Sequence, residues 1–133
     1  MPADGEMGLP FCYGDGSHKH AVEPKHTGSA VELANRMVAQ IRRPITWVHI
    51  PVPRGRAAAG YFAPLAGLKL KPGTELDLGL VHFTDRLEGA HHRIAGAKGA
   101  VSDFGIATEC RMGRRPPETI RNLLRLHREI AAF

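Results

Sequence analysis

No apolar run in this sequence approaches the ~20 residues that a helix needs to cross a lipid bilayer, so a membrane protein is not expected. Cysteine is scarce, with two residues in a chain of 133, and the two lack the close CxxC spacing of many zinc sites. The first residues also lack the basic start and apolar stretch of a secretory signal. These absences predict a cytoplasmic location, where thiols stay reduced.

Length sets a further limit on the fold. A chain of 133 residues is long enough for one domain with a hydrophobic core and too short for two. A complete (β/α)8 barrel needs roughly 250 residues and is therefore excluded. We expect a flexible N-terminus over residues 1–8 and a single domain over residues 9–133.

The net charge of +5 comes from 18 basic and 13 acidic residues, and the surplus lies near the C-terminus. A basic helix there would suit nucleic acid or another phosphate-bearing partner. However, no aromatic side chains are interleaved with the arginines, and single-strand binders need them for stacking. We therefore favour a solvated helix face and rank nucleic-acid binding through Arg121, Arg125 and Arg128 last.

Four short apolar runs rich in strand-forming residues alternate with segments of helical periodicity. The apolar runs cover residues 9–13, 45–50, 76–83 and 104–110, and the helical segments cover 29–43, 61–68, 87–97 and 117–128. This alternation predicts an α/β fold of four βα units, in which helices cover a parallel sheet.

The helical segments carry start signals and apolar stripes. Ser29 and Glu32 have the capping-box spacing, which predicts that the first helix starts near Ser29. The last two helices are predicted to turn apolar stripes toward the core. These stripes are Leu87, Ala90, Ile94 and Ala97 in the third helix, and Ile120, Leu123, Leu124 and His127 in the fourth.

Polar side chains follow the C-terminal end of every predicted strand. Because parallel strands deliver these ends to one edge of a sheet, we expect a ligand site there. The candidates are Cys12, Tyr13, Asp15, His18, His20, His49, Arg54, His82, Asp85, Glu109, Cys110 and Arg114. Among them, Asp15, His18, Arg54 and Arg114 are the substrate-binding candidates, since arginine grips a carboxylate or phosphate well. Ion pairs from the arginines to Asp15 or Asp85 are the alternative.

Both cysteines lie at predicted strand ends, and a parallel sheet is able to bring such ends together. Two thiolates with an imidazole or a carboxylate would form a tetrahedral zinc site with one open position. Zinc in such a site lowers the pKa of a bound thiol or water, which then stays nucleophilic at neutral pH. The alternative for each cysteine is a small, buried apolar side chain.

Four segments taken together resemble the C-terminal half of cobalamin-independent methionine synthase-like proteins, in the superfamily shared with uroporphyrinogen decarboxylase. The segments are 11–15, 47–53, 79–82 and 107–114. The resemblance covers the chain from about Leu9 onward. It implies half of a (β/α)8 barrel and an activity like that of 5-methyltetrahydropteroyltriglutamate-homocysteine methyltransferase. In that reaction zinc activates a small thiol, which takes a methyl group from a folate donor.

The resemblance also implies a set of metal ligands. Cys12 looks like the first zinc cysteine of the family and Cys110 like the last. The family's zinc histidine falls on Pro10, which has no ligand atom, and its zinc glutamate falls near His49. Either His49 or Glu109 would complete a modified set.

The same resemblance implies a proton relay and a missing partner. His82 or Asp85 lies where the family supplies a proton-relay residue. The family's N-terminal barrel half has no counterpart in this sequence, and four βα units alone leave two unpaired sheet edges. We therefore expect a homodimer or a complementary half-barrel chain. The alternative is a partial barrel without catalysis, which assembles with itself or a partner.

Overall fold

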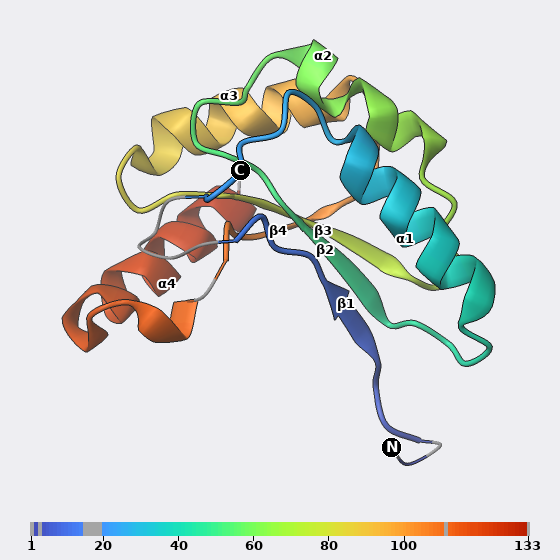
Figure 1. The fold of residues 1–133 in the computed structure, drawn as a ribbon. Coiled ribbons are helices and arrows are strands. Elements are labelled where there is room, and N and C mark those ends of the chain that lie inside the picture. Colours follow the sequence, from blue (N-terminus) through green and yellow to red (C-terminus); the bar gives the residue numbers. More distant parts are fainter. Residues whose placement is uncertain (1, 3, 15–19, 111, 133) are drawn as a thin grey trace.

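The computed structural model describes residues 2, 4–14, 20–110 and 112–132 (Figure 1). Its strands and α-helices are β1 (Gly8–Pro10), α1 (Gly28–Gln40), β2 (Trp47–Pro51), α2 (Ala59–Phe62), β3 (Glu75–Val81), α3 (Arg86–Lys98), β4 (Gly105–Thr108) and α4 (Pro117–Ala131). Short 3-10 helices at Ala63–Gly67 and Met112–Arg114 follow α2 and β4. The α/β fold of four βα units predicted from the sequence is confirmed.

The four strands are parallel and lie in the sheet in chain order, β1-β2-β3-β4. Leu9 lies opposite Val48, and Val48 lies opposite Leu76. Parallel strands in chain order with helices between them resemble half of a (β/α)8 barrel. Among the described residues, β1 pairs with β2 alone and β4 with β3 alone, so each outer strand has an open edge.

The main core lies between one face of the sheet and helices α1, α2 and α3, which lie together on that side (Figure 1). Val48, Ile50 and Leu78 are fully buried there, at the alternate positions that a strand turns to one face. Helix α1 adds Val31 and Val38. Burial of each large aliphatic side chain contributes about 1.5–3 kcal/mol.

The opposite face of the sheet carries larger and more polar side chains. Trp47, His49 and Asp77 are half-buried, and His49 and Asp77 lie opposite each other in the register of β2 and β3. The Trp47 ring covers Gly8 so closely that a Cβ there would lie 2.1 Å from a ring carbon. In a complete (β/α)8 barrel, this face of the sheet would line the interior.

Helix α1 starts at Gly28, with Thr27 as its N-cap, so the capping box predicted at Ser29 is wrong. The Thr27 hydroxyl donates to the buried carbonyl of Tyr61 at 3.3 Å, which ties the start of α1 to α2. Glu32 instead pairs with Arg36 one turn later on the exposed surface, at 2.6 Å.

The stripes predicted for α3 and α4 are partly wrong. Helix α3 buries Ala90, Arg93 and Ala97, whereas Leu87 is 37% exposed. Helix α4 buries Leu123, Leu126 and Ile130, and Leu124 is 54% exposed. In both helices the buried residues follow an i, i+3, i+7 spacing, which marks the stripe that faces the sheet.

The arginines of α4 lie on its exposed side, as expected of a solvated face.

Among the described residues, no helix combines the length and the apolar character needed to cross a membrane. The β1 strand begins at Gly8, close to the predicted domain start at residue 9.

Candidate functional site

Two cavities contain candidate residues. We call the first the thiol cavity; it has a volume of about 500 Å³ and is lined by Pro10, Phe11, Cys12, Trp47, His49, Asp77, Ala107, Thr108 and Cys110. We call the second the His–Glu pocket; it has a volume of about 320 Å³ and is lined by His20, Glu23, Arg54, His82, Phe83, Thr84, Glu109 and Arg115. The candidate residues predicted from the sequence are therefore divided between two cavities, with Cys12, His49 and Cys110 in the first and His82 and Glu109 in the second.

The two cysteines meet in the thiol cavity. Cys12 follows β1 by two residues and Cys110 follows β4 by two residues. The Cys110 thiol donates to the Cys12 sulfur across 3.3 Å. A disulfide bond is about 2.05 Å long, so this separation is that of two thiols in contact.

The prediction that His49 ends a strand is wrong, because β2 continues to Pro51; His49 lines the same cavity from the middle of this strand. Its Nε2 lies 3.0 Å from the Thr108 carbonyl oxygen and must be the donor, because a carbonyl accepts. Burial lowers the pKa of His49, an effect that the Thr108 carbonyl and Asp77 partly offset. The ring is therefore neutral at pH 7 and carries its lone pair on Nδ1.

The donor set fits zinc in part. Two thiolates bound to one zinc at ~2.3 Å would have their sulfur atoms roughly 3.8 Å apart in tetrahedral geometry, close to the separation of Cys12 and Cys110. A histidine ligand commonly donates its second ring N–H to a backbone carbonyl, as His49 does. Within the described ranges, however, no three His, Cys, Asp or Glu side chains already surround a common metal position.

Glu109 and Cys110 both follow the end of β4 at Thr108, yet Glu109 lines the His–Glu pocket and Cys110 lines the thiol cavity. Its side chain is 5% exposed, and Oε1 accepts a hydrogen bond from Arg115. Of the two candidate third ligands, His49 therefore shares a cavity with the cysteines and Glu109 does not.

His82 follows β3 and lies between residues that follow the two neighbouring strands, β2 and β4. Its Nε2 donates to the Val52 carbonyl at 2.8 Å, and its Nδ1 lies 3.7 Å from Oε2 of Glu109. Burial, helped by the charge of Arg93, lowers the pKa of His82 to about 4. At pH 7 the ring is therefore neutral, and its unprotonated Nδ1 is able to accept a hydrogen bond.

Asp85, the other candidate for the proton relay, forms a two-pronged ion pair with Arg93, at 2.7 and 2.8 Å. Burial alone would raise the pKa of Asp85, but the hydrogen bonds and charge of Arg93 outweigh it and lower that pKa. Asp85 is therefore an ionised carboxylate engaged in a structural pair.

Sequence analysis missed Arg93, whose side chain is 1% exposed. It donates to the carbonyls of Leu80 and Arg54, at 2.8 and 2.9 Å, in addition to Asp85. One guanidinium thus joins the loop after β2 to the end of β3. The available signal was its position between Ala90 and Ala97 on the buried stripe of α3, where a charged side chain needs a partner.

Of the four substrate-binding candidates, only Arg54 lines one of the two cavities among the described residues. Asp15 and His18 lie outside the described residues. Arg54 is exposed at the rim of the His–Glu pocket and donates to the Thr84 hydroxyl at 3.0 Å. Arg114 is exposed, and its neighbour Arg115, which sequence analysis did not single out, is the residue that lines the pocket.

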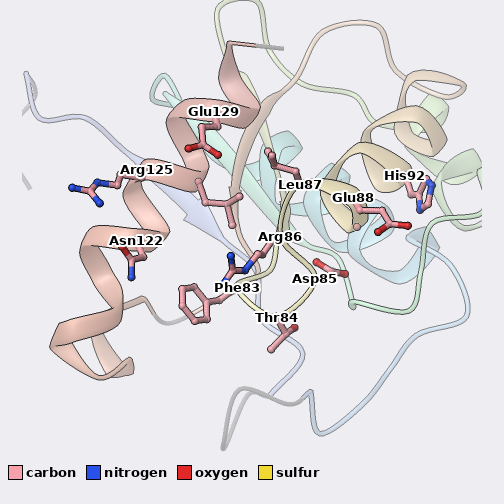
Figure 2. Close-up of a pocket in the computed structure, with 12 residues that line it drawn as sticks. Phe83, Thr84, Asp85, Arg86, Leu87, Glu88, His92, Asn122, Arg125 and Glu129 are labelled. Atoms are coloured by element: carbon pink, nitrogen blue, oxygen red, sulfur yellow. The ribbon is translucent and has the colours of Figure 1, made fainter.

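A wider groove of about 940 Å³ runs between the start of α3 and α4 (Figure 2). Arg86 lies near Phe83 and Asp85 in this view, whereas Arg125 extends outward from α4. Arg86 has a φ of 50°, which is strained for a residue with a side chain. The lining mixes both signs of charge and contains none of the predicted metal ligands.

Comparison with protein-family models, with curated proteins and with solved structures finds no match to this chain. The methionine synthase-like resemblance therefore stays a prediction, which rests on the four sequence motifs.

Proposed function

We propose that this chain is a methionine synthase-like half-barrel that uses Cys12 and Cys110 to hold zinc and to activate a small thiol for methyl transfer. The observation that carries the proposal is the 3.3 Å contact between the two sulfur atoms. The resemblance implies that these two residues are zinc ligands, and they are the pair that the fold brings together. A cytoplasmic location suits this chemistry, because thiols stay reduced there.

The proposed metal ligands line the thiol cavity, and the proposed proton-relay residue lines the His–Glu pocket. Cys12 and Cys110 supply two thiolates, and His49 presents a neutral imidazole to the same space. Bound zinc would lower the pKa of a substrate thiol and keep it as the nucleophilic thiolate. His82 lies where the resemblance implies a proton-relay residue, and a folate methyl donor is the one that the resemblance implies.

The test is zinc content after a chelator wash and reloading, measured for wild type, Cys12→Ser and Cys110→Ser. We expect about one zinc per wild-type chain and a large loss of affinity in each variant, since each removes one of few strong ligands. The exposed His92 provides the matched control, and His92→Gln should bind zinc like wild type. Absence of zinc from wild type, or zinc binding by both cysteine variants as tight as that of wild type, would refute the proposal.

A second proposal concerns assembly: the half-barrel is completed by a second copy of the chain or by a complementary half-barrel. Its support is the open edge of β1 and of β4 among the described residues, together with the half-buried face that carries Trp47 and His49. Two four-stranded units would supply the eight strands of a closed barrel.

Light scattering on the purified chain tests assembly. Self-closure predicts a solution mass twice the chain mass of 14.5 kDa. A dimer that binds zinc agrees with the methyl-transfer proposal, whereas a dimer without zinc indicates a partial barrel that assembles without catalysis. A monomer would exclude closure by a second copy.

A further inference from the structure

The His–Glu pocket holds buried polar atoms without partners among the described residues. Oε2 of Glu109 accepts no hydrogen bond from any of them, although the Glu109 side chain is 5% exposed. Nδ1 of His20, on the same pocket, is likewise buried and unsatisfied within the described part of the chain. Buried polar atoms are usually hydrogen-bonded, so such a cluster beside a cavity indicates a ligand that supplies the missing partners.

The two central atoms of this pocket are both acceptors. His82 carries its ring proton on Nε2, where it donates to Val52, so Nδ1 of the neutral ring has only a lone pair. Nδ1 lies 3.7 Å from Oε2 of Glu109, which is too far for a hydrogen bond between them. The space beside these atoms therefore suits a group that donates a hydrogen bond.

The surrounding charge selects among possible donors. Arg93 and Arg115 lie close to the two acceptors, and burial with the charge of Arg93 disfavours a positive charge on His82. Arg115 already pairs with Glu109, so Oε2 lacks a hydrogen-bond donor rather than a second positive charge, and a neutral hydroxyl supplies that donor. Arg54 at the rim uses Nη1 to bind Thr84 and has further N–H groups for a carboxylate.

We propose that the His–Glu pocket binds a small hydroxycarboxylate, whose hydroxyl donates to Oε2 of Glu109 and whose carboxylate meets Arg54. The pocket volume of about 320 Å³ falls at the lower end of the range for small-molecule sites. This ligand site goes beyond the proposed thiol chemistry and depends on neither cysteine.

Three probes with one carbon skeleton test the donor requirement: lactate carries a hydroxyl, propionate carries none, and alanine carries an ammonium. Each is titrated into the full-length protein, and backbone amide shifts are followed by NMR. We expect lactate to bind about tenfold more tightly than propionate and than alanine. Equal binding of lactate and propionate, tighter binding of alanine, or no saturable shift with lactate would overturn the proposal.

Variants then locate the site. Arg54→Gln should weaken lactate and propionate equally, by about tenfold, because it removes the carboxylate partner. Glu109→Gln should lower the affinity for lactate to that for propionate. Arg54 is exposed, so its variant keeps the test decisive even where Glu109→Gln fails to fold. Arg121→Gln, an exposed change on α4, is the control and should bind lactate like wild type.

The double variant Cys12→Ser, Cys110→Ser separates the two proposals. It should lose zinc yet bind lactate unchanged, since neither cysteine lines the His–Glu pocket. Unchanged lactate affinity in Arg54→Gln would overturn the ligand site, whatever the result with zinc.

Discussion

The sulfur atoms of Cys12 and Cys110 lie 3.3 Å apart, although 98 positions separate them and their strands form opposite edges of the sheet. On a flat sheet, three strand spacings of about 4.8 Å would hold the ends of β1 and β4 roughly 14 Å apart. Curvature of the sheet and the turns after both strands must close this distance. The thiol pair is therefore a product of the half-barrel shape, and its chemistry should report on that shape.

A trivalent arsenical should detect the thiol pair. Phenylarsine oxide forms two As–S bonds to paired thiols and releases water, so we expect one adduct per folded chain in an intact mass spectrum. Cys12→Ser and Cys110→Ser should each lose the adduct on dilution, because a single As–S bond dissociates readily. His49→Gln keeps both sulfur atoms and serves as the control. Retention of the adduct by a single-cysteine variant would contradict the observed proximity.

The low pKa of His82 should make stability depend on pH. The unfolded chain binds a proton on this ring near pH 6.5, but the folded chain binds it only near pH 4. Between these values the unfolded state holds more protons, so stability falls as the pH is lowered. The loss should reach about 3 kcal/mol across this window.

Urea denaturation at several pH values measures that loss. His82→Asn removes the titrating ring and should flatten the profile between pH 6.5 and 4. The exposed His92→Asn is the matched control and should keep the wild-type slope. An unchanged slope in His82→Asn would show that the ring titrates alike in both states.

Replacement of Arg93 by Met should destabilise the fold strongly. The change removes a buried ion pair with Asp85 and leaves two carbonyls without their donor, at a cost of about 3 kcal/mol. Arg93→Lys should rescue little, because an ammonium lacks the planar fork that meets both carboxylate oxygens. Free energies of unfolding from urea titrations provide the measurement.

Arg36→Met is the control for Arg93→Met. Arg36 also pairs with an acidic residue on its own helix, but its side chain is 72% exposed. Its loss should change stability by less than about 1 kcal/mol. Equal effects of the two variants would show that Arg93 does not join the ends of β2 and β3.

Gly79 in the centre of the sheet should tolerate no side chain. A Cβ there would lie 2.9 Å from the Cα atoms of Pro51 and Glu109, and backbone on both sides has little room to yield. Gly79→Ala should therefore cost about 1–3 kcal/mol. Gly60→Ala is the control, because its Cβ would meet nothing within 4 Å and should be neutral or stabilise by about 0.5–1 kcal/mol. Thermal unfolding of both variants decides the comparison.

Sequence patterns predicted much of the fold because local signals and the final structure agree. The alternation of apolar runs with helical segments led directly to the four βα units, and strand-end positions located His82 and both cysteines beyond the ends of β3, β1 and β4. Patterns were weaker for helix faces. Leu124 follows the apolar Leu123, so the sequence predicted that it belongs to the buried stripe. The packing of α4 against the sheet buries Leu126 and Ile130 instead.

The sequence by itself determined the α/β class, the four βα units and the edge at which polar side chains gather, since these follow from residue periodicity and strand direction. Only the tertiary structure decided which of those side chains meet. It joined Cys12 to Cys110 across the sheet, separated Glu109 from its neighbour Cys110, and set Glu109 beside His82 and Arg115. These contacts depend on sheet curvature, loop paths and the direction of each side chain, none of which is encoded in a local pattern.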